Sequence, residues 1–254
     1  MPGEHTPLLP SASSTRKFKR KLKEYVDRNS NDMIPILSTL CIVTGFLDAI
    51  SYATHSVWAG FQTGNSLQFS LALSRLTTKS ENIPPDMSRF DYAFSEPDKV
   101  TIASLVFFAL GAHAGGYFHP TKRRSLIMAS ALQTALTVVA AGLLVDAHRD
   151  MMSAHVSLCL IAFTLGLQGV QAKLLGPSVF GTSLVLTTAW VTLMNADRRS
   201  IVSKSLPVVF LVLGGFIGGT VLGYTDAATA TGIVAAVRGI ITLAWLKVKA
   251  EVIL

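Results

Sequence analysis

Six long apolar blocks constrain the fold of this 254-residue chain more than any other feature of its sequence. Each block has about 20 residues with few charges, and as a helix it would be about 30 Å long, close to the hydrocarbon thickness of a bilayer. Only 15% of the residues are charged, whereas a soluble domain carries about 25%. We therefore predict an all-α transmembrane fold with six spanning helices. The six blocks are residues 33–53, 100–118, 125–145, 154–174, 205–223 and 227–246.

Two further apolar blocks, 57–74 and 178–194, are interrupted by glycine and polar residues. Gln62-Thr63-Gly64-Asn65 interrupts the first block, and Gly181-Thr182-Ser183 interrupts the second. Basic residues decide how such blocks cross, because short loops rich in Lys and Arg stay on the cytoplasmic side. If the basic N-terminal segment and Lys122-Arg123-Arg124 are both inside, residues 33–99 allow one net crossing. Both interrupted blocks are therefore predicted to be re-entrant or broken helices, and both termini to be cytoplasmic.

The N-terminal segment, residues 1–32, is polar and basic, and we predict a disordered cytoplasmic tail ahead of a polytopic membrane domain over 33–254. The net charge of +7 does not indicate nucleic-acid binding, because the basic residues gather next to the first span, where they favour anionic lipid. Glu4, Leu8 and Leu9 fit an acidic dileucine signal for a sorting adaptor. That signal favours a vacuolar, endosomal or plasma-membrane location.

An internal repeat is predicted from the order of the blocks. Residues 45–73 contain the end of a span, a short turn and a broken apolar block, and residues 166–193 have the same layout. In the predicted topology the first copy starts inside and the second outside. This gives two inverted three-span halves, about 33–145 and 154–246. Inverted repeats with broken helices are typical of transporters that bind their substrate between the halves.

The stretch from Gly45 to Tyr52, together with Gln62-Thr63-Gly64-Asn65, resembles the signature of the YoaK-like microbial membrane proteins. Gly166-Leu167-Gln168 and Gly176-Pro177-Ser178-Val179 match later positions of the same family, so the resemblance extends over about 35–246. It implies a multi-pass membrane protein of a family without a settled activity. The chain departs from the family at Gly169-Val170, where Asn-Ala is usual, and at Val185-Leu186, where a Thr-Gly pair is usual.

Asp48 and Arg238 are charged residues inside predicted spans. A charged side chain in a span costs about 2.5–3.5 kcal/mol on insertion scales, so it normally faces a cavity or a partner. Asp48 is interpreted either as a proton or cation site or as a structural carboxylate that caps the re-entrant segment. Arg238 would contact an anionic solute or pair with Asp48 in a structural ion pair.

The interrupted block supplies the remaining candidate binding residues. Gln62, Thr63 and Asn65 offer donors and acceptors, Gly64 permits a break in the backbone, and Gln168 is the counterpart in the second half. The alternative is that these amides only satisfy the broken backbone. Glycine-rich helices such as 111–116 also allow close contact, either within one chain or between protomers of a homo-oligomer.

These features favour a secondary transporter or facilitator for a small solute, with protonation of Asp48 coupling transport to a gradient. The alternative is a membrane scaffold or trafficking factor that recruits partners through its tail. We expect no enzyme, metal or cofactor, because the sequence has neither a phosphate-binding loop nor an intramembrane-protease motif.

Overall fold

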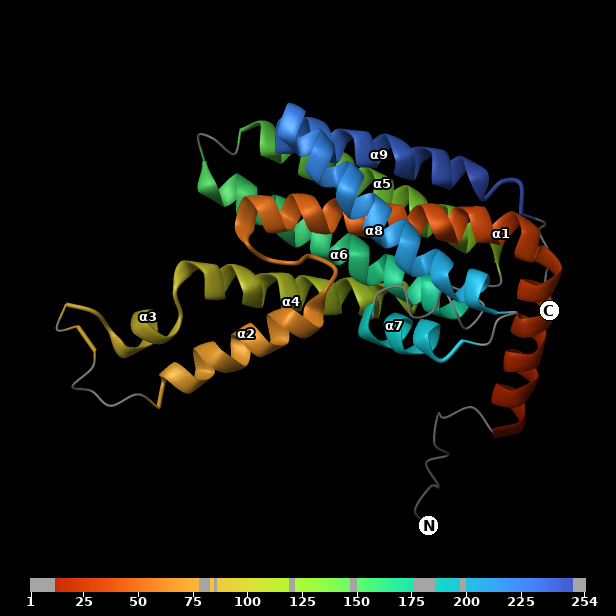
Figure 1. Ribbon diagram of the computed structural model, residues 1–254, viewed down its shortest axis with the longest axis horizontal. Coiled ribbons are helices and arrows are strands. Elements are labelled where there is room, and N and C mark those ends of the chain that lie inside the picture. The colour runs from red at the N-terminus through yellow and green to blue at the C-terminus, as the bar shows by residue number, and fades with distance from the viewer. Residues whose placement is uncertain are drawn as a thin grey trace, which may run out of the picture.

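The computed structural model describes residues 12–77, 83–84, 86–118, 122–146, 150–175, 186–196 and 200–248, and every regular element within them is a helix. Figure 1 shows these helices packed side by side, most of them along one long axis. Their bounds are α1 Ala12–His55, α2 Gln62–Arg75, α3 Arg89–Ala93, α4 Glu96–Gly115, α5 Arg123–Val145, α6 Met151–Leu175, α7 Leu186–Met194, α8 Ile201–Tyr224 and α9 Ala227–Ala244.

Five stretches of the described helices are long and apolar enough to cross a membrane. They are Met33–His55, Arg123–Val145, Met151–Leu175, Lys204–Tyr224 and Ala227–Ala244. Each overlaps one of the six predicted blocks, so the all-helical class is confirmed for the described residues and five of the six predicted blocks are candidate spans. The sixth predicted block falls on α4, which begins with a charged turn and ends at Gly115, before the predicted end at residue 118.

The N-terminal segment differs from the prediction of disorder over 1–32. Helix α1 begins at Ala12, so 12–32 is helical, and residues 1–11, with the dileucine-like signal, lie outside the described residues. Lys, Arg and Glu have good helix propensity, which explains a helix in this basic stretch. Figure 1 shows this part of α1 bending away from the bundle. Pro35 inside the helix is the expected cause of the bend, because proline removes a hydrogen bond and clashes with the preceding turn.

Helices α1 and α6 form the centre of the bundle. Leu47 and Ile50 of α1 and Leu158 and Leu165 of α6 are buried. In Figure 1, α5 and α9 lie above α1, while α2 and α4 lie below it. The outward faces of α5, α8 and α9 expose apolar side chains, including Val138, Val139, Leu213, Phe216, Ile240 and Leu243. Such a surface is expected where helices contact lipid rather than water.

The crossing of α1 and α8 depends on two glycines. A Cβ at Gly45 would overlap the carbonyl oxygen of Leu211, and a Cβ at Gly214 would overlap that of Ile42. Each glycine thus faces the residue three positions before the other glycine. Small residues at these points let the two backbones touch, which is how helices pack closely in membranes.

The crossing of α4 and α6 uses the same arrangement. A Cβ at Gly111 would overlap the carbonyl oxygen of Phe163, and a Cβ at Gly166 would overlap that of Phe108. Here too, each glycine faces the residue three positions before the other one.

The two interrupted blocks have different outcomes. In the first, the chain leaves α1 at His55, turns back over 56–61 and starts α2 at Gln62 near the middle of the bundle (Figure 1). Helix α2 then runs outward toward the same end of the bundle at which α1 ends (Figure 1). In the second, 176–185 lies outside the described residues, and only α7 can be placed.

An ion pair ties α2 to α4 at that end of the bundle. Arg75 Nη1 and Nη2 lie 2.9 and 3.1 Å from the two carboxylate oxygens of Asp98, which also accepts a hydrogen bond from Ser95 N. Burial alone would raise the pKa of Asp98, but the hydrogen bonds from Arg75 and Ser95 outweigh it and the pKa lies below its usual value. The carboxylate is therefore charged and holds α2 against α4.

Candidate functional site

The break between α1 and α2 is closed by side chains of α1. Asp48 Oδ1 accepts a hydrogen bond from Gly60 N at 2.6 Å, and Ser51 Oγ accepts one from Ala59 N at 3.1 Å. Asp48 is buried, with 8% of its surface exposed. Backbone N–H groups outside a helix need other acceptors when they are buried, and Asp48 and Ser51 supply them here.

The amides of α2 satisfy the carbonyl groups of the same loop. Gln62 Nε2 donates to Ala59 O at 2.7 Å, and Asn65 Nδ2 donates to Trp58 O at 2.7 Å and to Gln62 Oε1 at 3.0 Å. Gln62 Nε2 also approaches Ser104 Oγ of α4 at 3.4 Å. In this conformation both amides bond to carbonyl groups of the broken backbone, which is the alternative to solute binding that the sequence left open.

Two residues of the predicted block lie away from this loop network. Gly64 is inside the first turn of α2 and has no positive φ, so the predicted break at Gly64 is wrong and the break falls at 56–61 instead. The chain reverses there through Ser56, whose φ of 55° is left-handed. Thr63 is exposed on α2 and makes no described hydrogen bond to the loop.

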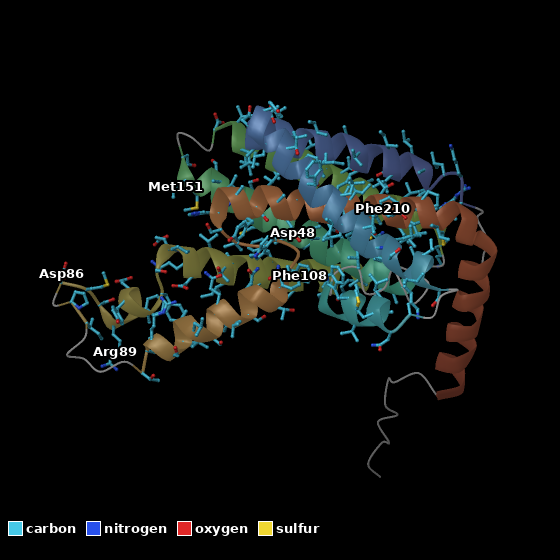
Figure 2. The ribbon with its side chains drawn as sticks, viewed as in Figure 1. Asp48, Asp86, Arg89, Phe108, Met151 and Phe210 are labelled. Atoms are coloured by element: carbon cyan, nitrogen blue, oxygen red, sulfur yellow. The ribbon has the colours of Figure 1, made fainter. Side chains whose placement is uncertain are left out.

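A cavity of about 560 Å³ lies between α1, α8 and the loop. Thr44, Asp48 and Tyr52, which recur every four residues along one face of α1, form one wall. The opposite wall is formed by α8, through Leu211, Val212 and Gly215. The loop closes one side of the cavity, through Trp58, Gly60 and Phe61. The rings of Tyr52 and Trp58 are stacked, with centroids 4.2 Å apart and planes 16° from parallel. Figure 2 places Asp48 between Met151, near one end of the bundle, and Phe210 of α8.

Asp48 is the one charged residue among the described residues that line this cavity. No described Lys, Arg or His lies within 4 Å of its carboxylate, and Oδ2 receives no described hydrogen bond. A buried carboxylate without a cation is costly, so the cavity is suited to a proton or a positively charged group.

Arg238 is in a separate network in the centre of the bundle. Arg238 Nη1 donates to Thr137 Oγ1 at 2.7 Å and approaches Gln133 O at 3.4 Å, and Nη2 donates to Gln168 Oε1 at 3.0 Å. Arg238 is 1% exposed, its Nε has no described partner, and no described carboxylate lies within 4 Å of the guanidinium. Arg238 of α9 therefore joins α5 and α6 through neutral acceptors, and the predicted pairing with Asp48 is absent.

Gln168 connects this network to α1 and to the cavity. Its Nε2 donates to Leu40 O at 3.0 Å and to Thr44 Oγ1 at 2.8 Å, while its Oε1 accepts from Arg238. Thr44 lines the cavity one turn before Asp48. The predicted binding residues therefore divide into a loop group, Asp48, Gln62 and Asn65, and a core group, Gln168 and Arg238. Thr44, which Gln168 contacts, lines the same cavity as Asp48.

Several residues at these two sites were not predicted from the sequence. Ser51 and Tyr52 lie three and four positions after Asp48, a spacing that places them on its face of the helix. Thr44 could have been found by the same periodicity. Gln133 and Thr137 carry no comparable signal, because their partner Arg238 is about 100 residues away in the sequence.

The donor chemistry also limits what the sites can hold. Within the described residues, no group of three or more His, Cys, Asp and Glu side chains is placed to hold a metal ion.

A family model described as a protein of unknown function, DUF1275, matches residues 36–244. This match confirms the resemblance to the YoaK-like family that the glycine, aspartate and Gln-Thr-Gly-Asn motifs indicate. No curated protein and no solved structure matches the chain.

Proposed function

Since the chain belongs to the DUF1275 family, whose activity is unknown, we propose from its geometry that it is a secondary transporter or facilitator for a small solute. The observation that carries this proposal is the cavity at Asp48. An unpaired carboxylate lines a cavity of about 560 Å³ beside a broken helix, in a bundle of candidate spans. Non-helical backbone at membrane depth persists where protein buries it or where it lines a water-filled path.

The two glycine crossings support an inverted repeat. The α1–α8 and α4–α6 crossings place glycines in equivalent positions, and Gly45 and Gly166 begin the two copies of the sequence repeat. Helices α1 and α6 run in opposite directions in Figure 1, as do α4 and α8. The contacts of α2 with α4 and of α7 with α8 also correspond. Two halves related in this way can rock against each other around a site between them.

Six spans follow if α4 crosses the membrane with the five other stretches. Helix α4 has 20 residues, about 30 Å, and its charged first turn would lie at the interface with water. Helix α2 has 14 residues, about 21 Å, which is too short to cross. An even number of spans places both termini on one side, and the basic residues before Met33 make that side the cytoplasm.

Cysteine accessibility tests whether the cavity belongs to a path through the membrane. In protein whose Cys41 and Cys159 are replaced, the variant Ala49→Cys places one thiol on the cavity wall. A charged, impermeant thiol reagent is then applied from either side of sealed vesicles. We expect labelling from both sides, because a transporter exposes its site alternately to each compartment.

Two matched positions control this measurement. Val139→Cys on the exposed apolar face of α5 and Ala162→Cys in the core of α6 should stay unlabelled from both sides. If folded Ala49→Cys protein reacts from one side alone, or from neither, under all conditions, the transport proposal is wrong.

A further inference from the structure

We infer that the solute of the Asp48 cavity is a small organic monocation, held between the carboxylate and the stacked rings of Tyr52 and Trp58. This inference rests on the proposed function, because it names the class of solute for the same cavity. Three properties of the cavity wall support it: the charge of Asp48, the small number of free oxygen ligands, and the stacked aromatic rings.

The described wall of the cavity has one charged side chain, that of Asp48. Asp48 uses Oδ1 to accept the Gly60 N–H, which leaves Oδ2 without a described donor. Arg238, the buried cation of the core, is engaged by Thr137 and Gln168 and does not reach Asp48. A positive group inside the cavity would therefore remove the one uncompensated charge of its wall.

The supply of oxygen ligands disfavours a bare divalent cation as the occupant. Hard cations such as Mg²⁺ and Ca²⁺ take six or more oxygen ligands at short distance. Beside Asp48, the hydroxyl of Thr44 already donates to Leu40 O and accepts from Gln168 Nε2. The rest of the wall is mainly apolar and glycine-rich, and the volume of about 560 Å³ is typical of small-molecule sites.

The stacked rings provide the second half of an organic-cation site. Tyr52 is one turn after Asp48 on α1, and Trp58 reaches the same wall from the loop. Aromatic faces attract ammonium groups through their quadrupole, and Trp is the most effective ring. A carboxylate beside such rings favours a cation with an apolar body over a neutral molecule of the same shape.

Competition binding between cations and neutral molecules of the same shape tests this inference directly. The full chain in lipid nanodiscs is titrated with labelled choline, and 3,3-dimethyl-1-butanol, its uncharged isostere, is the competitor. Benzylammonium and benzyl alcohol form a second pair for primary ammonium groups. We expect each cation to bind at least about tenfold more tightly than its neutral partner.

Variants assign the binding to the cavity. Asp48→Asn should weaken choline binding at least about tenfold, and Tyr52→Ala should weaken it about threefold or more, while Tyr52→Phe and the lipid-facing Val139→Ala retain it. If Asp48→Asn does not fold, the isostere pairs and the exposed Tyr52 still decide the question.

The outcomes separate this inference from the transport proposal. Equal binding of cations and isosteres, or no binding of either cation at millimolar concentration, overturns the cation inference even if Ala49→Cys is labelled from both sides. Asp48-dependent cation binding with labelling from one side alone supports the cation inference and overturns transport.

Discussion

At the scale of single residues, two buried charges are stabilised in different ways. Asp48 lies on a cavity wall with one oxygen bonded to the loop, whereas Arg238 is bonded to the side chains of Thr137 and Gln168 and approaches the backbone carbonyl of Gln133. Both terminal nitrogens of Arg238 are bonded to neutral groups, which braces the bundle, while a carboxylate with an unused oxygen on a cavity wall is available to a ligand. The two residues therefore have separate roles, although both are charges inside helices.

The bracing role of Arg238 predicts a loss of stability when the guanidinium is removed. Arg238→Met should lower the free energy of unfolding by about 1–3 kcal/mol for each acceptor left unpaired, because Thr137 Oγ1 and Gln168 Oε1 lose their donor in a dry core. Thermal unfolding of the detergent-solubilised protein measures the effect. Ile240→Ala, at an exposed position of the same helix, serves as control and should have little effect. An Arg238→Met protein as stable as the unmodified chain would contradict the bracing role and favour contact with a solute.

At the scale of helices, the bundle depends on two crossings at which glycines let the backbones touch. The α1–α8 and α4–α6 crossings are built alike, so the same substitution should have the same effect at both. The break at 56–61 adds a third constraint, because it positions the start of α2 against α1 and α4.

Alanine substitutions at the crossings test this equivalence. Gly45→Ala and Gly166→Ala should each destabilise the fold by about 1–3 kcal/mol, because the added methyl group overlaps a carbonyl oxygen of the neighbouring helix. Gly142→Ala and Gly219→Ala are matched controls, since an added Cβ meets nothing within 4 Å at either position. Alanine has better helix propensity than glycine by about 1 kcal/mol, so both controls should be neutral or stabilising. Equal unfolding midpoints for the crossing and control variants would contradict the role of the crossings.

Sequence reasoning found five candidate spans because apolar length specifies them, and it found Asp48 because a charge in a predicted span stands out. It placed the break at Gly64 because glycine permits unusual backbone, but the turn is made by Ser56 and closed by Asp48 and Ser51. It could not show that Arg238 and Asp48 belong to two separate hydrogen-bond networks. Depth along a helix follows from counting residues, whereas rotation about the axis depends on packing against distant helices.

At the scale of the whole molecule, the two halves of the proposed repeat differ in chemistry. Asp48 follows Gly45 by three residues, and the residue at the same spacing after Gly166 is Gly169. The second half therefore carries no carboxylate at the equivalent point, and its Gln168 joins the core network instead. In the proposed transporter, one charged site lies in the first half while the second half supplies the scaffold against which it moves.

Uptake of choline into proteoliposomes under an imposed membrane potential, negative inside, tests whether solute passes through the Asp48 cavity. We predict that the full chain accumulates labelled choline above the level of empty liposomes, and that Asp48→Asn protein reconstituted at equal density does not. Uptake by the full chain equal to that of empty liposomes, or equal uptake by the Asp48→Asn protein, would contradict a transport path through the Asp48 cavity.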